Sequence, residues 1–196
     1  MRTKFWAACA MLIAPWAAAT AQRPAPAPVG SPPPAGEIPT VEFVFEERVT
    51  LGPSVAVGET PYGSRNLVPI TGGEVAGPKL RGTILPYGWD WQLKPSDGCT
   101  LLSAEYFLKA EDGTVIHVLN TSQSCESIGP ASARSFFRPV FEVPKSSKYA
   151  WLNSGTFVAE LRMNGAPPQP PPAGSPGAAA PREKAGAVSI RFYQIH

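Results

Sequence analysis

The sequence has few of the residues that build metal centres. Its 196 residues include three cysteines and two histidines, with no Cys-x-x-Cys pair and no metal-type histidine spacing. It also lacks the Gly-x-Ser-x-Gly element of many hydrolases, and the Gly72-x4-Gly77 spacing has Pro78 where a phosphate-binding loop needs lysine. We therefore expect neither a metal nor a cofactor, and the common hydrolase and metalloenzyme classes find no support.

An excess of charge of one sign is lacking as well. The chain has 17 basic and 15 acidic residues, so its charge balance does not suggest nucleic acid as a partner. The apolar run 5–19 is too short to predict a membrane span. Basic residues precede this run and Ala19-Thr20-Ala21 ends it, which is the layout of a secretory signal peptide over residues 1–21. We expect cleavage near Ala21 and export to the periplasm or the medium, with an uncleaved anchor as the alternative.

Two cysteines remain after such a cleavage, because Cys9 leaves with the signal peptide. Cys99 and Cys125 then form an even pair in an oxidising compartment, which predicts one disulfide worth about 3 kcal/mol. Two free buried thiols are the alternative.

Helical periodicity is absent, since apolar residues nowhere recur at helical spacing for ten residues. Residues 22–39 are almost all Pro, Ala, Gly and Ser and predict a disordered tether. The segment 41–47 alternates instead, which places Val41, Phe43 and Phe45 on one face of a first strand.

Short strand segments separated by turn residues continue to the C-terminus. Residues 40–196 therefore predict one all-β domain, an antiparallel barrel or sandwich of about 8 to 10 strands. The last segment, 190–195, can pair with the first strand and close the sheet, which removes exposed edges and favours the β-barrel. Residues 164–187 are rich in Pro and Ala, and we expect a disordered insert in the C-terminal hairpin.

One stretch, residues 71–92, concentrates five glycines and two tryptophans, and the tryptophans flank the carboxylate of Asp90. Glycine at this density implies positive φ angles or close backbone approach, and predicts strand, tight turn and strand. Asp90 lies between Trp89 and Trp91, where a carboxylate needs hydrogen-bond donors or has a raised pKa. Asp90 is therefore the first candidate for chemistry.

Several blocks of the sequence together resemble a known family. In chain order they are Gly58-x-Thr60-Pro61-x-Gly63-x-Arg65, Pro69-Ile70-Thr71-Gly72-Gly73, Gly77-Pro78-x-Leu80-x-Gly82-x-Ile84-Leu85-Pro86, Asp90-Trp91-Gln92, Asp112-Gly113 and Tyr149-Ala150-Trp151-Leu152-Asn153. From about residue 41 to 195 the chain is similar to the DUF3237 family, also called UPF0311. The resemblance implies an antiparallel β-barrel with an internal pocket, in a family most of whose members have no assigned function. Where that family usually has Gly-Gly-Ala-Asp-Trp, this chain has Trp89 in place of the alanine, which adds bulk beside the carboxylate.

We expect this pocket to be bordered by six residues: Arg65, Asp90, Trp91, Gln92, Trp151 and Asn153. Asp90 serves as a general acid or base or as a ligand acceptor, or else it caps the glycine turn. The tryptophans stack a flat ligand or belong to the core, and the amides orient a ligand or bind turn backbone. Arg65 holds a ligand carboxylate or pairs with Asp90 internally, and we favour the internal pair.

Two more titratable residues lie on predicted strands. Glu105 shares a strand face with Leu101 and Phe107, so we expect it inside the barrel as a second acid/base candidate, unless a bulge turns it to solvent. His117 is expected at the surface of a strand.

Function is therefore predicted as an exported barrel that binds a small planar or aromatic organic molecule in its pocket. The alternative is a cofactor-independent lyase or isomerase with Asp90 as general acid/base. A passive envelope protein is a third possibility.

Overall fold

The computed structural model describes residues 29–30, 32–125, 135–163 and 186–196. The predicted signal peptide 1–21 and nearly all of the predicted insert 164–187 lie outside these residues. The chain divides into two units, Met1–Ile38 and Pro39–His196. In the described part of the first unit, the predicted tether contains the short 3-10 helix η1, Ala35–Glu37. No helix of the described residues is long and apolar enough to cross a membrane.

The second unit is an all-β domain, which confirms the predicted fold class. Its strands are β1 (Val41–Leu51), β2 (Val55–Thr60), β3 (Gly63–Ala76), β4 (Gly82–Ile84), β5 (Gly88–Lys94), β6 (Cys99–Ala110), β7 (Val115–Cys125), β8 (Ser135–Glu142), β9 (Thr156–Met163) and β10 (Gly186–Ile195). A short 3-10 helix, η3 (Ala150–Asn153), lies between β8 and β9.

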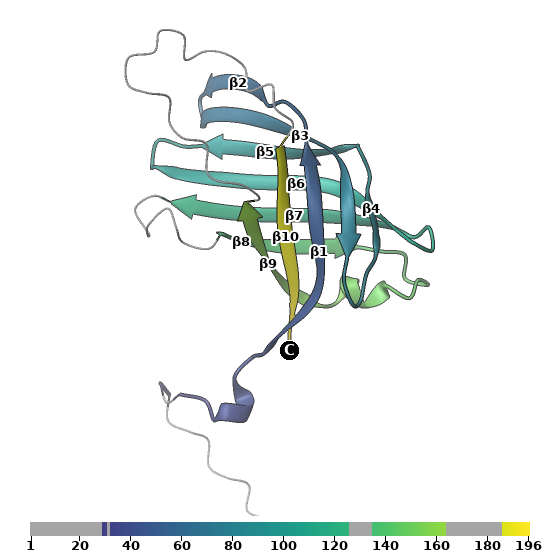
Figure 1. Ribbon diagram of the computed structural model, residues 1–196. Helices are drawn as coiled ribbons and strands as arrows, with labels where there is room; N and C mark the ends of the chain where they lie inside the picture. The colour runs from purple at the N-terminus through teal and green to yellow at the C-terminus, as the bar shows by residue number, and fades with distance from the viewer. Residues whose placement is uncertain (1–28, 31, 126–134, 164–185) are drawn as a thin grey trace, which may run out of the picture. The chain divides into compact units, whose positions relative to one another are not determined.

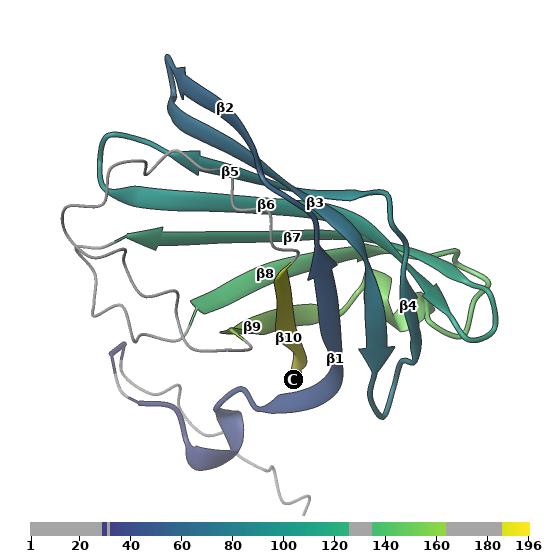
Figure 2. The ribbon, with the colours of Figure 1, turned by 45° about the horizontal axis from the view of Figure 1, so that its top comes forward.

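These strands close into an antiparallel barrel. The sheet runs β1-β10-β9-β8-β7-β6-β4-β3, and β1 also pairs with β3, so the ring is complete. Because β4 and β5 both pair with β3 and β6, they share one position in this ring, which makes it an eight-position barrel. Figures 1 and 2 show β1 and β10 side by side, crossing the direction of β5, β6 and β7. The predicted pairing of the last strand with the first is confirmed.

A bulge in β1 changes which of its side chains face inward. The register with β10 shifts between Phe43 and Phe45, and Val44 and Phe45 are both fully buried. Val41 and Phe43 are 61% and 38% exposed, so the prediction that they share the inner face with Phe45 is wrong. An extra residue in one strand reverses the alternation on either side of it. Beyond the bulge, Glu47 follows Phe45 into the interior.

A bend in β3 lets this strand serve two neighbouring pairs. Its first half pairs with β2 and β5, and its second half with β1 and β4. The change of partner occurs at Gly72 and Gly73, whose φ angles are 141° and 147°. Residues with a side chain rarely adopt such backbone angles, so glycine at both positions permits the bend in β3. The prediction of positive φ in this stretch is confirmed at these two glycines.

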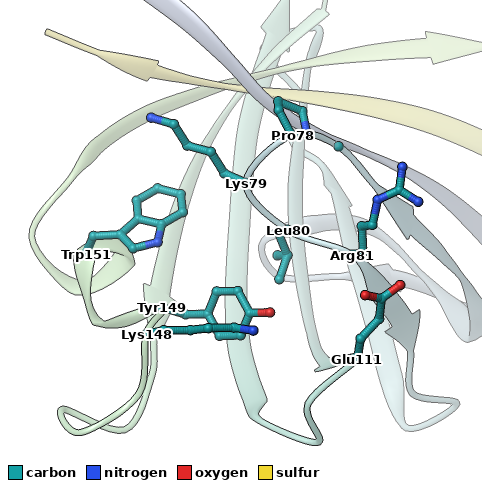
Figure 3. Close-up of a pocket in the computed structure, with 9 residues that line it drawn as sticks. Pro78, Lys79, Leu80, Arg81, Glu111, Lys148, Tyr149 and Trp151 are labelled. Carbon is teal, nitrogen blue, oxygen red and sulfur yellow. The ribbon is translucent and has the colours of Figure 1, made fainter.

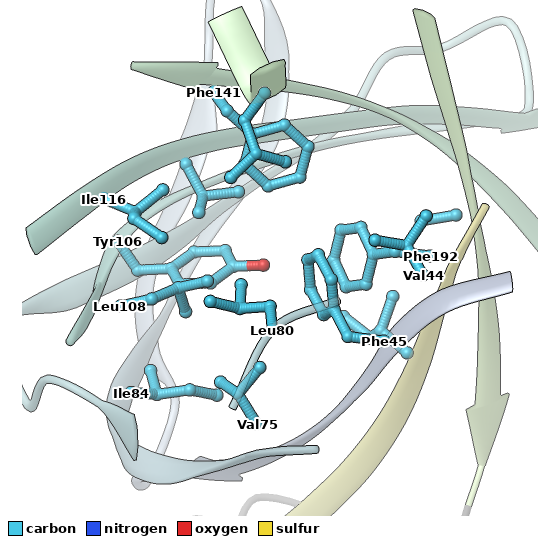
Figure 4. Close-up of a cluster of buried hydrophobic side chains, with 14 of the residues drawn as sticks. Val44, Phe45, Val75, Leu80, Ile84, Tyr106, Leu108, Ile116, Phe141 and Phe192 are labelled. Carbon is cyan, nitrogen blue, oxygen red and sulfur yellow. The ribbon is translucent and has the colours of Figure 1, made fainter. Parts of the chain in front are cut away.

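Apolar side chains from most of the strands fill the barrel. Phe45 stacks on Phe192 with ring centroids 4.5 Å apart, and Phe141 contacts both rings edge-on or tilted. Leu80, from the connection between β3 and β4, closes one end of this core and is 2% exposed. Figure 4 shows the Tyr106 hydroxyl pointing into the same interior beside Leu80.

The predicted disulfide is present. Cys99 begins β6 and Cys125 ends β7, and the two residues are direct partners in the register of that hairpin. The bond therefore joins two strands that are already paired, at the end of the barrel away from Leu80.

Replacement of both cysteines by serine should lower the free energy of unfolding. The bond closes a loop with a sequence separation of 26, which corresponds to roughly 3 to 4 kcal/mol of chain entropy. Urea denaturation of the double variant should show a lower midpoint than the oxidised parent, and the parent in reductant should approach the variant. An unchanged midpoint would contradict this account of the bond.

Candidate functional site

The barrel interior contains a carboxyl group with no exposed surface. Glu47 of β1 faces inward between Phe45 and Val49, and its Oε2 accepts a hydrogen bond of 2.7 Å from the Tyr106 hydroxyl. Burial disfavours the ionised form and raises the pKa of Glu47 from 4.5 to about 8, although the hydrogen bond from Tyr106 acts in the lowering direction. Glu47 is therefore mostly a neutral acid at pH 7.

Tyr106 and Asn120 complete this centre from the opposite wall. The pKa of Tyr106 is raised well above 10, first by burial and then by the neighbouring Glu47 carboxyl group. Asn120 of β7 is fully buried next to the Tyr106 hydroxyl, yet neither its amide oxygen nor its amide nitrogen has a hydrogen-bond partner of good geometry. We call Glu47, Tyr106 and Asn120 the polar centre.

Asp90 lies on the same inner surface. In the register of the sheet it is opposite Ala104, and Ala104 is opposite Asn120. Directly opposed residues lie on one face, so Asp90 and Asn120 both face inward with only the small Ala104 side chain between them. Asp90 on β5 and Asn120 of the polar centre on β7 are thus separated by one strand, β6, at the position of the Ala104 methyl group.

A chain of amides holds Asp90 in place. Gln92 Nε2 donates to Asp90 Oδ2 at 2.8 Å, and Asn66 Nδ2 donates to Gln92 Oε1 at 3.2 Å. Burial raises the pKa of Asp90, and hydrogen bonds from Gln92 and the backbone of Ser103 partly offset the rise. The other carboxylate oxygen, Oδ1, is buried without a partner.

In the described residues, four buried side-chain atoms have no hydrogen-bond partner, and all belong to this inner surface: Glu47 Oε1, Asp90 Oδ1, Asn120 Oδ1 and Asn120 Nδ2. A buried polar atom without a partner costs about 1 to 3 kcal/mol, so native proteins rarely leave one alone. The interior therefore has donor and acceptor capacity for a water molecule or for polar groups of a ligand.

Exposure along the strands indicates where this interior meets solvent. Asn66, Gln92 and Leu102 face inward but are only half-buried. They lie toward the end of the barrel that carries the Cys99–Cys125 disulfide, whereas Leu80 closes the other end. The polar surface thus lies between a closed apolar core and a partly open rim.

The structure brings Asp90 and Gln92 together as predicted, but places Trp91 and Arg65 elsewhere. Successive strand residues point to opposite faces, so the exposed Trp91 indole lies outside the barrel. Arg65 follows the same alternation, because its neighbour Asn66 bonds inward to Gln92. No ion pair joins Arg65 to Asp90 among the described residues, and the internal pair favoured from the sequence is not formed.

Trp151 and Asn153 lie at the opposite end of the barrel, in or beside η3. Both amide atoms of Asn153 are bonded to the backbone of Val143, at 2.8 and 3.0 Å, so its side chain connects backbone rather than facing a pocket. Trp151 is partly buried, packs on Phe157 and lines a surface groove. The six predicted residues therefore do not form one site.

Glu105 points out of the barrel, so its prediction as an interior acid/base residue is wrong. It does share a face with Phe107, but Tyr106 and Leu108 occupy the inner face and Phe107 is exposed. Glu105 instead contacts His117 at 3.0 Å on the outside of the sheet. His117 lies at the strand surface, as expected. No cluster of three potential metal ligands occurs among the residues that the structure describes.

Sequence reasoning missed all three residues of the polar centre. Alternation beyond the bulge was the available signal for Glu47, two residues after Phe45. Tyr106 and Asn120 had weaker signals, since a tyrosine or asparagine in a strand is common on either face.

Fold and site together define a class: a small closed antiparallel β-barrel with a polar inner surface near one rim. The chain belongs to the DUF3237 family, whose model, described as "Protein of unknown function (DUF3237)", matches residues 39–170. The family predicted from the sequence is thereby confirmed.

Relatives of known sequence include bacterial and fungal proteins. A UPF0311 protein of Rhodopseudomonas palustris is 31% identical over 134 residues, covering 61% of this chain and 87% of the relative. The hydroalkoxylation enzyme phnH of Penicillium herquei is 29% identical over 118 residues, covering 60% of this chain and 71% of the relative. Among solved structures, a Rhodopseudomonas palustris protein of unknown function is similar with a TM-score of 0.63 and 26% identity, covering 81% of this chain and 99% of that one.

Stability should fall as the pH rises from about 4.5 to about 8. Glu47 ionises near 4.5 when unfolded and near 8 when folded, so the native state binds more protons between these values. The stability present below pH 4.5 is lost across this window, by about 5 kcal/mol in all, and levels off above it. Urea denaturation of parent and Glu47→Gln protein from pH 4.5 to 9 measures the effect.

Glu47→Gln should remove that pH dependence, because glutamine does not ionise. Glu59→Gln is the matched control, since Glu59 lies exposed on β2 and should leave the parent's pH profile unchanged. A parent whose stability is flat over this window would contradict a buried neutral Glu47.

Proposed function

We propose that this protein binds a small planar or aromatic organic molecule inside the barrel, with its polar end at Asp90 and the polar centre. One observation carries the proposal: the four buried atoms without partners all face the same interior. A ligand with one hydroxyl and one carbonyl group supplies a donor for the carboxylate oxygen and partners for the amide of Asn120.

The apolar part of such a molecule has matching surface at the rim. Leu51, Leu102, Leu161 and Val188 are only partly buried and pack against the core from β1, β6, β9 and β10. A flat hydrocarbon body placed against these side chains loses its contact with water, which favours binding. Polar residues on one wall and aliphatic residues on the other then fix its orientation.

A second candidate function is cofactor-independent proton transfer on the bound molecule, as in a lyase or isomerase. Two carboxyl groups with raised pKa values on one interior surface favour it, since acid/base catalysts have a pKa near the working pH. The similarity to a hydroalkoxylation enzyme adds support. Addition of an O–H group across a carbon–carbon double bond needs one proton removed from oxygen and one delivered to carbon.

In this scheme Asp90 accepts the proton of the substrate hydroxyl through its free oxygen. The substrate oxygen then bonds to one alkene carbon, and Asp90, protonated in the first step, returns that proton to the other carbon, so that atoms and charge balance and Asp90 is regenerated. Because Glu47 is neutral at pH 7, Asp90 is the one negative charge of this surface in the scheme. Glu47 also accepts the hydrogen bond of the Tyr106 hydroxyl and so fixes the orientation of that group beside the bound molecule.

We also propose that the protein is exported after cleavage near Ala21. The layout of residues 1–21 supports this, and the Cys99–Cys125 disulfide agrees with an oxidising compartment.

Asn120→Leu separates a ligand site from a structural cluster. Replacing an unsatisfied amide by an apolar group of similar shape should leave the melting temperature equal or higher. Native mass spectrometry of protein from its exported fraction should show a bound small molecule in the parent and none in Asn120→Leu. The same spectrum should give a protein mass lacking residues 1–21.

Thr121→Val, next to Asn120 but not on the inner face, is the control and should keep the ligand. The polar centre would be purely structural if Asn120→Leu strongly lowered the melting temperature and if the parent protein carried no bound molecule in its mass spectrum.

Asp90→Asn distinguishes a binder from a catalyst. With 2′-hydroxychalcone, whose phenol adds across its own double bond, a catalyst should lose roughly a hundredfold in kcat while binding is retained. Glu105→Gln changes the neighbouring carboxyl group on the outer face and should keep the parent rate. Binding of the chalcone with no acceleration over the spontaneous reaction would leave the binding function and overturn the catalytic one.

A further inference from the structure

We infer a second ligand site, at the opposite end of the barrel from the polar centre, that takes a small aromatic anion. The site is a groove of about 280 Å³ lined by the β3–β4 connection, by Glu111 after β6, and by the segment leading into η3. Its lining residues are Gly77, Pro78, Lys79, Leu80, Arg81, Glu111, Lys148, Tyr149 and Trp151. A volume of this size suits a molecule of one ring rather than a large cofactor.

The floor of the groove is built into the core. Leu80 and Tyr149 are 2% and 6% exposed, so neither can move without disturbing the barrel. Gly77 allows the connection to lie directly on β1, because a Cβ atom there would collide with the backbone of Phe45. The Lys79 amide also donates to the Val44 carbonyl at 3.2 Å. The groove is therefore formed before any ligand arrives.

Charge in the groove favours an anion. Its lining has three cationic side chains, Lys79, Arg81 and Lys148, against the single carboxylate of Glu111. In the described part of the chain, no hydrogen-bond or ion-pair partner is found for the Arg81 guanidinium group. Figure 3 shows Arg81 and Glu111 on one side of the groove and Lys79 with Trp151 on the other.

The two lysines have partners that a ligand can replace. Lys79 pairs with Glu42, and Lys148 pairs with Asp112 at 3.2 Å. All four side chains are substantially exposed to solvent, and ion pairs of this kind contribute little net stability. A ligand carboxylate that approaches Arg81 and Lys148 can thus compete without breaking a buried network.

Aromatic surface specifies the rest of the ligand. Lys79 Nζ lies 5.5 Å from the Trp151 ring centre, and Lys148 Nζ lies 5.0 Å from that of Tyr149. The partly exposed Trp151 ring forms a wall on which a planar ring can stack above the buried Tyr149 of the floor, while the cations remain near its acidic group. An aromatic carboxylate satisfies both features, whereas a bare anion uses only the charge.

This site is separate from the interior proposed above. Ala104, beside Asp90, and Ala110, next to Glu111, are six residues apart on β6, which corresponds to roughly 20 Å along a strand. The inference therefore does not depend on the function proposed for the interior.

Titration of ¹⁵N-labelled protein with benzoate tests the site through the indole N–H signals of its tryptophans. The Trp151 signal should shift and saturate, while those of Trp89 and Trp91, on the outer face of β5, should not move. Arg81→Gln and Lys148→Gln should each weaken binding about tenfold, the loss expected for one charge-assisted hydrogen bond. Added salt should weaken binding in the parent.

Matched controls make the outcome decisive. Lys145→Gln changes an exposed lysine of the same connection that does not line the groove, and should leave the affinity unchanged. Asn120→Leu should also leave it unchanged, which separates this test from that of the interior. Equal affinity for benzyl alcohol would overturn the anion requirement, and equal affinity for inorganic phosphate would overturn the aromatic one. A shift at Trp89 or Trp91 in place of Trp151 would overturn the location.

Discussion

Closure of the barrel by β1 is the constraint on which the rest of the structure depends. This strand pairs with β10 over nearly its whole length and with β3 over its second half, joining the two edges of the sheet. Closure removes free edges and surrounds the interior with strands. It also carries Phe45 into the aromatic core and Glu47 into the polar centre. The bulge beside Phe45 therefore sets both the packing and the chemistry of the interior.

Burial then determines the protonation of that interior. A carboxyl group with no exposed surface favours its neutral form, and Tyr106 provides its only hydrogen bond in the described structure. Asp90, nearer the rim, is held by Gln92 and is less completely enclosed. The two ends of the barrel consequently differ in kind: one has buried and partly buried acids and amides, and the other a cationic groove lined by Trp151 and Tyr149.

Much of the fold followed from alternation and turn residues, because period-two patterns and glycine turns are local. The pairing of β10 with β1 and the Cys99–Cys125 bond were also predicted, since both link segments with few alternative partners. The outward positions of Val41 and Phe43 were not predicted, because the bulge in β1 reverses the alternation on either side of it. The face of Glu105 was not predicted either, because Phe107, the apolar neighbour on the same face, is itself exposed. Trp151 was predicted to lie near Asp90 only because both residues are of types found in ligand pockets. The two lie at opposite ends of the barrel, roughly 20 Å apart along the strands.

The central claim is that Glu47 is a neutral acid inside the barrel at pH 7. Carbon-13 NMR of protein labelled at the glutamate side-chain carboxyl carbons measures this directly. The account predicts one signal that stays protonated at neutral pH and titrates near 8, and that is missing from Glu47→Gln protein. A spectrum in which every glutamate has lost its proton by about pH 6 would contradict the account.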